Sequence, residues 1–140
     1  MSNTLTIVKP DAVAAGNAGN ILAHLQKEGF TFRGIKMLRL SEDQAKAFYE
    51  VHKERPFYGE LVKFMTSGPV VAAALQRDDA VPHLRAVMGA TNSNEAAEGT
   101  IRNLYGTDIE QNAIHGSDSD ENAEIETAFF FSRSELIGAA

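Results

Sequence analysis

Apolar residues follow two different periods along this chain, and these periods predict where the strands and helices lie. Residues 4–9 alternate between polar and apolar types before turning apolar, which is typical of a strand, and Pro10 is predicted to end it. Residues 30–40 alternate less regularly and predict a second strand. Two unbroken apolar runs predict a fully buried strand at 69–75 and a last strand at 128–131.

Helical spacing of apolar residues, together with signals for helix ends, predicts the helices between these strands. Ser41 and Gln44 form a capping box, and Gly29 and Ser119 are suited to end one helix and begin another. The predicted helices cover 21–28, 42–49, 60–66, 79–88 and 120 to about 126. Residues 16–20 are predicted as a loop, and 89–118 as irregular apart from a turn at 95–97.

The order of these elements predicts an α+β fold and a single domain over residues 1–140. It favours a ferredoxin-like sandwich of the split βαβ type, in which a four-stranded antiparallel sheet carries helices on one face. The loop at 89–118 is too long to be a plain connection. Loops of that length in compact domains are usually functional or disordered, and we expect an active-site loop there.

Composition narrows the classes of protein that fit. Hydrophobic residues make up 44% of the 140 residues, which is normal for a globular protein. There is no apolar run near 18 residues and no evident signal peptide, so we expect no membrane association. The absence of cysteine excludes disulfides, thiolate metal sites and thiol catalysis, and it fits a cytoplasmic location. A net charge of −6 does not favour binding to nucleic acid.

The segment from Asn112 to Ser119 places His115 beside Gly116 in a run of short polar residues. Such residues are typical of turns, which display chemical groups rather than bury them. We expect the glycine to leave space for an incoming group. Imidazole is mostly neutral at pH 7 and is a competent nucleophile, so His115 is the leading candidate for covalent catalysis. The other histidines, His24, His52 and His83, lie in predicted helices and are interpreted as solvated or structural.

Six motifs, in order and near the expected spacing, resemble the nucleoside diphosphate kinase family. They are Thr6-Ile7-Val8-Lys9-Pro10-Asp11, Arg55-Pro56-Phe57, Ser67-Gly68-Pro69-Val70, Gly89-Ala90-Thr91-Asn92, Gly99-Thr100-Ile101-Arg102 and Asn112-Ala113-Ile114-His115-Gly116-Ser117-Asp118-Ser119. The resemblance covers nearly the whole chain. It implies ping-pong transfer of the terminal phosphoryl group of a nucleoside triphosphate, mainly ATP, to a nucleoside diphosphate through a phosphohistidine.

The resemblance assigns roles to particular residues near the reacting group. His115 would carry the phosphoryl group, and Glu126 would accept a hydrogen bond from the ring and fix its tautomer. Tyr49 and Ser117 would support the histidine. The cations Lys9, Arg85 and Arg102, with Thr91, would clamp the phosphate oxygens, because phosphoryl transfer depends mainly on positioning and charge.

The same resemblance implies how the rest of the nucleotide is held. Phe57 would stack on the base, which accepts any base because every base has a π-face, and Ile109 would pack on its other side. Asn112, together with Lys9, would bind a sugar hydroxyl. There is no Gly-x-x-x-x-Gly-Lys-Ser/Thr motif and no visible metal cage, so Mg²⁺ would arrive on the nucleotide phosphates rather than on protein side chains.

One departure from the family pattern concerns assembly. Ser93 follows Asn92 where the family usually has proline, in a loop that packs at subunit contacts. The family implies a homo-oligomer, a tetramer or a hexamer built from a common dimer, and the sequence does not choose between them.

Two other functions fit the sequence less well than the kinase. A nucleotide-binding module without turnover would not need the histidine, and the presence of Lys9, Arg85, Arg102, Asn112 and His115 together argues against it. A histidine phosphatase-like hydrolase would need a second acid and an arginine–histidine pair in one motif, and the chain has neither.

Overall fold

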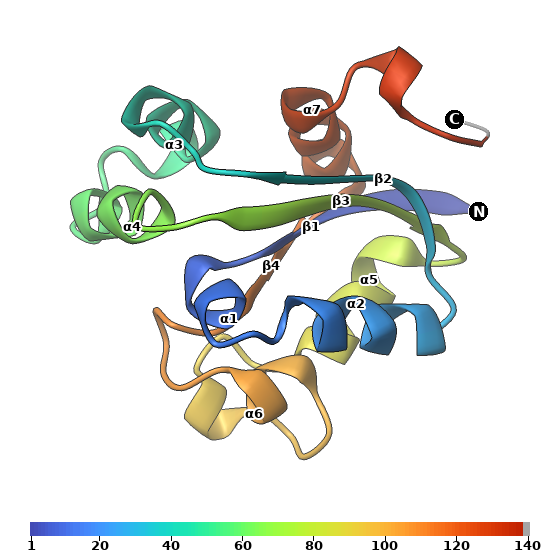
Figure 1. Cartoon of the computed structure of the whole chain (residues 1–140), viewed down its shortest axis with the longest axis horizontal. Helices are drawn as coiled ribbons and strands as arrows, with labels where there is room; N and C mark the ends of the chain where they lie inside the picture. The colour runs from blue at the N-terminus through green and yellow to red at the C-terminus, as the bar shows by residue number, and fades with distance from the viewer. Residues whose placement is uncertain (139–140) are drawn as a thin grey trace.

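A four-stranded antiparallel sheet forms the centre of the computed structural model, which describes residues 1–138 (Figure 1). The strands are β1 (Ser2–Val8), β2 (Thr31–Leu38), β3 (Val70–Arg77) and β4 (Ile114–Gly116), and their order across the sheet is β2-β3-β1-β4. The helices are α1 (Pro10–Ala14), α2 (Ala18–Lys27), α3 (Glu42–Phe48), α4 (Tyr58–Met65), α5 (Ala80–Met88), α6 (Ile101–Tyr105) and α7 (Asp120–Phe130). Short 3-10 turns are η1 (Glu50–His52), η2 (Ser93–Glu95) and η3 (Arg133–Glu135).

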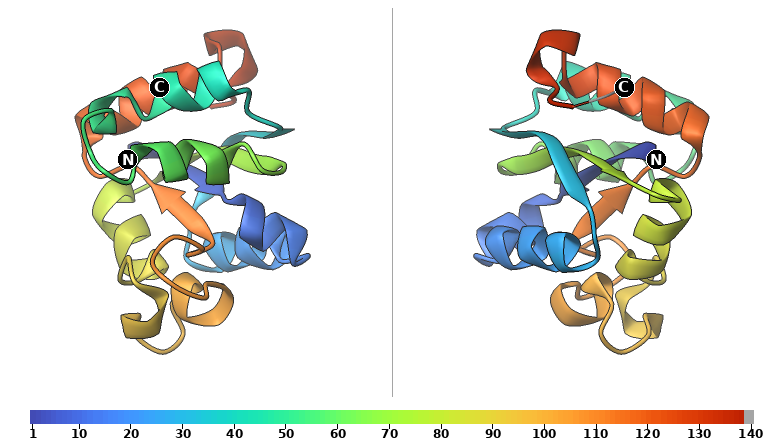
Figure 2. Two further views of the ribbon diagram at one scale, coloured as in Figure 1. Left: turned by 90° about the vertical axis from the view of Figure 1, so that its left-hand side faces the viewer. Right: turned by 90° about the vertical axis from the view of Figure 1, so that its right-hand side faces the viewer.

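Helices cover both faces of the sheet, so the expectation of helices on one face was wrong. Figure 2 shows α3 and α7 on one side of the sheet and α1, α2, α5 and α6 on the other. The side chains of β3 explain why. Val71, Ala73 and Leu75 belong to the core under α2 and α5, and Val70, Ala72 and Ala74 belong to the core under α3, α4 and α7. A strand buried on both faces needs no polar side, which is why its sequence is an unbroken apolar run.

The fourth strand is β4, whereas the sequence pattern placed a last strand at 128–131. Residues 128–130 instead continue α7, which ends at Phe130. Ala123, Thr127 and Phe130 recur at helical spacing and are the buried residues of α7, so packing against the sheet overrides the strand preference of the phenylalanines. The three residues of β4 are too few to show a period.

Two short helices also escaped prediction. Pro10 begins α1 instead of only ending β1, because proline lacks an N–H that the first turn of a helix leaves unpaired anyway. In the loop expected at 89–118, Thr100 caps α6 by accepting a hydrogen bond from the Asn103 N–H. The turn expected at 95–97 lies at η2, slightly earlier in the chain.

The predicted α+β fold with a four-stranded antiparallel sheet is confirmed, and so is the capping box of α3. The Ser41 hydroxyl accepts from the Gln44 N–H, and the Gln44 side chain accepts from the Ser41 N–H. Within residues 1–138, no helix combines the length and the apolar character that crossing a membrane requires.

Candidate functional site

His115 lies in the middle of β4, on a strand rather than in the turn that the sequence suggested. It pairs with Ile7 of β1, and its backbone carbonyl accepts a hydrogen bond of 2.8 Å from the Thr6 hydroxyl. The side chain is 22% exposed. Two aromatic rings of the α3 end stand edge-on to the imidazole, Phe48 at 5.5 Å and Tyr49 at 6.5 Å between centroids. The backbone of His115 is therefore held in the sheet, and its side chain is partly open to solvent.

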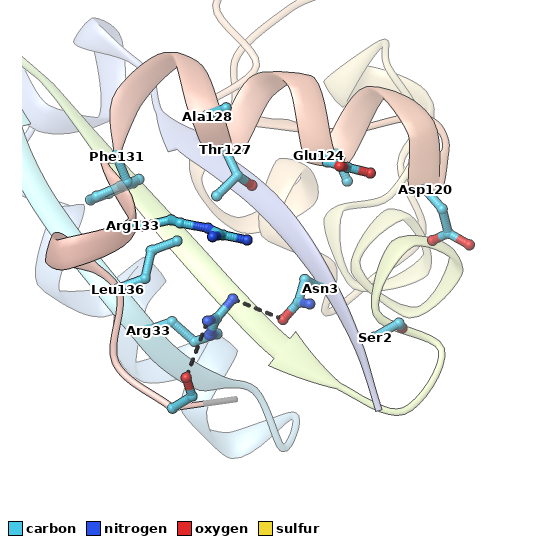
Figure 3. A pocket seen from close by; sticks show the side chains of 12 residues that line it. Ser2, Asn3, Arg33, Asp120, Glu124, Thr127, Ala128, Phe131, Arg133 and Leu136 are labelled. Carbon is cyan, nitrogen blue, oxygen red and sulfur yellow. Dashed lines mark hydrogen bonds between the residues drawn. The ribbon is translucent and has the colours of Figure 1, made fainter. Parts of the chain in front are cut away.

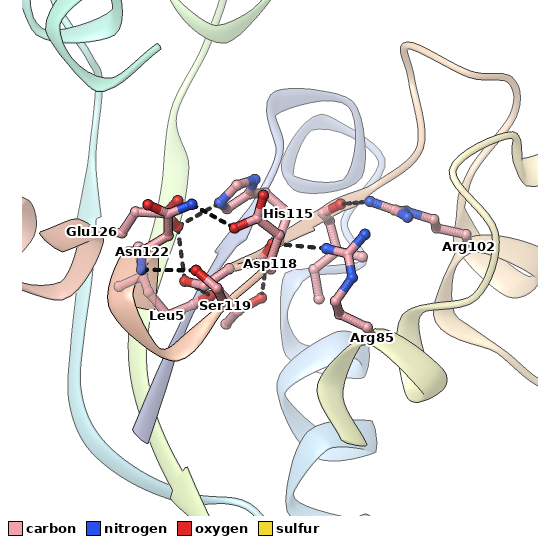
Figure 4. Close-up of polar contacts among 12 residues, drawn as sticks. Leu5, Arg85, Arg102, His115, Asp118, Ser119, Asn122 and Glu126 are labelled. Carbon is pink, nitrogen blue, oxygen red and sulfur yellow. Dashed lines mark hydrogen bonds and ion pairs between the residues drawn. The ribbon is translucent and has the colours of Figure 1, made fainter. Parts of the chain in front are cut away.

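Glu126 of α7 contacts the histidine ring. Its Oε1 lies 2.8 Å from His115 Nε2, and the same oxygen accepts a hydrogen bond of 2.8 Å from the Ser117 hydroxyl (Figure 4). A carboxylate accepts hydrogen bonds, so Nε2 carries the proton of the neutral ring. Among the described residues, no hydrogen bond reaches Nδ1. That nitrogen therefore keeps its lone pair in the neutral ring.

Tyr49 lies against the histidine but does not bond to it. The side chain is 6% exposed, and its hydroxyl is buried without a hydrogen-bond partner among residues 1–138. Burial, and then the negative charge of Glu126, raises the pKa of the Tyr49 hydroxyl. Tyr49 is therefore a neutral neighbour of the pair formed by His115 and Glu126.

Two arginines approach His115 from the side opposite Glu126 (Figure 4). Arg85 of α5 donates to the Gly116 carbonyl at 3.4 Å, and Arg102 of α6 donates to the Ile114 carbonyl at 2.8 Å. Both carbonyls belong to residues adjacent to His115. The two guanidiniums thus place positive charge on both sides of the backbone at His115.

Arg102 is the more constrained of the two. It is 7% exposed and also donates to the Gly89 carbonyl at 3.1 Å, while its Nε has no partner among the described residues. Burial, followed by repulsion from Arg85, lowers the pKa of the Arg102 guanidinium to about 10. Its partners are neutral carbonyls, which leaves its positive charge available to an anion.

Lys9 and Asn112 form a second polar group beside the histidine. The Lys9 ammonium donates to Asn112 Oδ1 at 2.7 Å, and the Asn112 amide donates to the carbonyls of Thr91 at 2.9 Å and Ile109 at 3.1 Å. Burial and the nearby Arg102 lower the pKa of the Lys9 ammonium to about 8. The structure therefore joins Lys9, Thr91 and Asn112, three residues that are distant in sequence.

The candidate base-binding residues are exposed. Phe57, at the start of α4, is 48% exposed, and its ring lies 5.7 Å from that of His52. Ile109 is 63% exposed. Exposed apolar side chains of this kind are available for stacking. His52 was interpreted as solvated or structural, and its ring also lies 6.3 Å from that of Tyr49.

Gly116 has a different purpose from the one expected. A Cβ there would lie 2.7 Å from the Met88 sulfur and 2.9 Å from Leu84 Cδ2, both on α5. The glycine lets α5 pack closely on β4, which brings Arg85 beside His115. Asp11 was also missed as a functional candidate, although its carboxylate accepts from the Ala113 N–H at 3.1 Å.

A cavity of about 670 Å³ lies away from His115, between α7, the start of β1 and the C-terminal segment (Figure 3). It contains Arg33, which bonds to the Ile137 carbonyl at 2.9 Å and to Asn3 at 3.4 Å. None of the predicted site residues lines this cavity. Within residues 1–138, no group of three or more His, Cys, Asp or Glu side chains could hold a metal ion.

Comparison with known proteins gives a consistent result. The family model described as "Nucleoside diphosphate kinase" matches residues 2–136. A nucleoside diphosphate kinase of Persephonella marina is 52% identical over 137 residues, 98% of each chain, and one of Chlamydia trachomatis is 52% identical over 139 residues, 99% of each chain.

Solved structures give the same match. A nucleoside diphosphate kinase structure from Aquifex aeolicus superimposes with a TM-score of 0.96 at 49% identity, covering 97% of this chain and 99% of that chain. One from Halobacterium salinarum, in complex with CDP, has a TM-score of 0.94 at 41% identity, covering 99% of this chain and 93% of that chain.

Proposed function

Because this chain belongs to the nucleoside diphosphate kinase family, we propose that it transfers a phosphoryl group by a ping-pong route through His115. Family membership makes the chain an enzyme that moves phosphate between nucleoside triphosphates and diphosphates. The phosphohistidine intermediate, with ATP as the main donor, is the finer proposal. The observation that carries it is the 2.8 Å contact between His115 Nε2 and Glu126 Oε1, which leaves Nδ1 as the free base.

The first half-reaction follows from that contact. Nδ1 attacks the γ-phosphorus, the bond from phosphorus to the β,γ-bridging oxygen breaks, and the nucleoside diphosphate leaves with that electron pair. The ring becomes positively charged as the P–N bond forms, and the Glu126 carboxylate on Nε2 stabilises that charge. In the second half-reaction, a terminal phosphate oxygen of another diphosphate attacks the same phosphorus and the neutral imidazole leaves.

Three positive side chains and one hydroxyl group would stabilise the charge on the phosphoryl oxygens. We assign Arg85, Arg102, Thr91 and Lys9 to this role, supported by the two guanidiniums beside His115 and by the buried cation of Lys9. Removing one donor of a preorganised clamp costs on the order of 3 kcal/mol of barrier. Ser117 and Tyr49 would keep Glu126 and the ring in place.

The nucleoside would be held mainly by stacking and by one polar pair. Phe57 would stack on the base, Ile109 would pack beside it, and Asn112 with Lys9 would bind a sugar hydroxyl. The CDP complex of the Halobacterium salinarum relative supports nucleotide binding by this fold. Mg²⁺ would come with the nucleotide phosphates, which supply the hard oxygen ligands that it prefers.

The proposal extends to the whole protein. We propose that residues 1–140 form one nucleoside diphosphate kinase domain, that the chain assembles into a tetramer or hexamer built from a common dimer, and that it works in the cytoplasm. The family match over 2–136 supports the single domain. Light scattering coupled to size exclusion would measure the assembly.

Labelling with γ-labelled ATP tests the central step. The protein should acquire label that survives base and is lost in acid, and His115→Ala should acquire none. His83→Ala is the matched control, because His83 also faces a carboxylate, Glu28 at 3.2 Å, and this variant should label like the wild type. A fully labelled His115→Ala protein would overturn the assignment. Tight ADP binding by a wild type that never labels would favour the binding-only alternative.

A further inference from the structure

The backbone makes an unusual turn between Asn112 and His115. Ala113 has a φ of 72°, in the left-handed region that residues with a Cβ seldom adopt. The Ile114 N–H donates to the Asn112 carbonyl at 2.8 Å, which closes a three-residue γ-turn around Ala113. The form with positive φ is rare and strained, and such strain persists only where the surroundings hold it.

The segment from Lys9 to Asp11 holds this turn from both sides. The Lys9 N–H donates to the Ala113 carbonyl at 2.8 Å, and the Ala113 N–H donates to Asp11 Oδ2 at 3.1 Å. The backbone N–H and the backbone carbonyl of Ala113 are therefore both held by hydrogen bonds. The other carboxylate oxygen, Asp11 Oδ1, is buried without a partner among the described residues. Asp11 is thus placed to bind the turn at the expense of its own solvation, and burial raises the pKa of its carboxyl group.

The turn decides how two parts of the site face each other. Before the turn, Asn112 Oδ1 accepts a hydrogen bond from the Lys9 ammonium. On the other side, β4 begins at Ile114 and carries His115 in register with Ile7. A nucleotide whose sugar binds Asn112 and whose phosphate reaches His115 would span the distance between these two residues. A shift of Ala113, which lies between them in the chain, would change that distance even if both side chains were intact.

We propose that Asp11 is a positioning residue for phosphoryl transfer, which holds the γ-turn at Ala113 and so aligns Asn112 and Lys9 with His115. This inference rests on the proposed function. It goes beyond capping of the five-residue helix α1 that contains Asp11, because the carboxylate also accepts a hydrogen bond from a residue 102 positions away.

Two phosphoryl donors, ATP and phosphoramidate, distinguish a loss of nucleotide alignment from a loss of His115 reactivity. Phosphoramidate reacts directly with imidazole: its P–N bond breaks, ammonia leaves, and a new P–N bond forms on His115. It has no nucleoside to align. For Asp11→Ala we expect labelling by ATP to fall ~100-fold, the usual effect of an ångström-scale misplacement, while labelling by phosphoramidate stays near the wild-type rate. Asp11→Asn keeps an oxygen that accepts from the Ala113 N–H, so it should label with ATP nearly as the wild type does.

Asp43→Ala is the matched control, because Asp43 is an exposed acid in the first turn of α3. It should label normally with both donors. If folded Asp11→Ala also labels normally with ATP, or loses both donors equally, the inference is wrong. A wild type that labels with neither donor would instead contradict the proposed function.

A double variant keeps the test decisive if Asp11→Ala fails to fold. Glycine adopts a positive φ without strain, so Asp11→Ala with Ala113→Gly should fold. Glycine does not fix the turn, so labelling by ATP should remain low while phosphoramidate labelling persists. Recovery of the wild-type ATP rate would show that Asp11 supplies stability alone and would overturn the inference.

Discussion

At the scale of single residues, the site depends on which of its polar atoms already have hydrogen-bond partners within the protein. The Ser117 hydroxyl and His115 Nε2 share one oxygen of Glu126, so that carboxylate has a fixed direction. Arg102 and Lys9 donate to neutral oxygens, and among residues 1–138 neither has an anionic hydrogen-bond partner. A base with one free nitrogen and buried cations beside it suit the transfer of an anionic group.

Glu126→Gln tests the role of the carboxylate. Glutamine retains an oxygen that can accept from Nε2 but loses the charge that stabilises the ring when phosphorus is attached. Losing such a supporting carboxylate typically costs 10- to 100-fold, and we expect about that decrease in the rate of phosphoenzyme formation, measured by rapid quench. Glu124→Gln, an exposed position on the same helix, is the control and should keep the wild-type rate. Equal losses in both variants would contradict the role.

The Lys9 pKa of about 8 predicts that nucleotide binding takes up a proton in mildly alkaline solution. In the free protein at pH 8.5, most Lys9 side chains are neutral, and nearby phosphates should raise the pKa and recharge them. At pH 6.5 Lys9 is already charged, so it should contribute no uptake. Titration calorimetry with ADP in buffers of different ionisation enthalpy measures this.

Lys9→Met should remove the uptake at pH 8.5, and Lys27→Met, at an exposed position of α2, should retain it. The linked effect on folding has a definite sign. The folded pKa of Lys9 lies below the ordinary value of 10.5, so the unfolded chain binds more protons between about pH 8 and 10.5. The contribution of Lys9 to stability therefore rises across that range. Uptake that is the same in Lys9→Met would refute the assignment.

At the scale of elements, short segments carry the site. The strand β4 has three residues, α6 has five, and α1 has five, yet they present His115, Arg102 and the Asp11 carboxylate. Elements this short have little stability of their own and depend on tertiary packing. This is also why sequence periodicity did not find them.

The η2 turn offers a test of the departure at Ser93. Ser93 begins η2 after Asn92, whose ψ of 113° is the extended conformation that precedes proline. Ser93→Pro should raise the free energy of unfolding by about 0.5–1 kcal/mol, because it restricts the unfolded chain. The substitution removes a long hydrogen bond of 3.3 Å from the Ser93 N–H to the Asp108 carbonyl. It also removes the Ser93 hydroxyl, which is buried without a hydrogen-bond partner among residues 1–138. Urea unfolding at fixed protein concentration measures the change.

Asn94→Pro is the matched control, because the Asn94 N–H donates to Asn92 Oδ1 at 3.1 Å and proline would abolish that bond. It should be destabilising. A lower midpoint for Ser93→Pro than for the wild type would show that the loop does not accept proline.

At the scale of the whole molecule, the sheet brings together residues that are far apart in the chain. Lys9 follows β1 and bonds to Asn112 just before β4, whereas Arg85 of α5 and Glu126 of α7 lie beside the central residue of β4. The net charge is −6, so the cations at the site form a local positive region on an acidic protein. Such a region attracts anionic substrates and is sensitive to salt.

Removal of metal should affect the reaction but not the fold. Within residues 1–138, no cluster of acidic or imidazole side chains could hold a metal ion, and we propose that Mg²⁺ enters with the nucleotide. EDTA should leave the Tm of the nucleotide-free protein unchanged and stop phosphotransfer from ATP. Thermal unfolding and labelling, each with and without EDTA, measure the two effects. A Tm that falls with EDTA alone would indicate a structural metal and contradict the proposal.

The sequence by itself determined the fold class, the family and the identity of the candidate site residues. Alternation, capping boxes and six motifs are local patterns, and physical constraints that act over a few residues leave local patterns. The capping box of α3 and the buried strand at β3 were readable for this reason.

Only the tertiary structure decided which atoms of these residues contact one another. It placed His115 on a strand, gave Nε2 to Glu126 and left Nδ1 free among the described residues, and it revealed that Gly116 makes room for α5. It also extended α7 through the phenylalanines that resembled a strand and joined Asp11 to Ala113. These features depend on contacts between segments about ten to a hundred residues apart, and contact energies across such separations leave no period in the sequence.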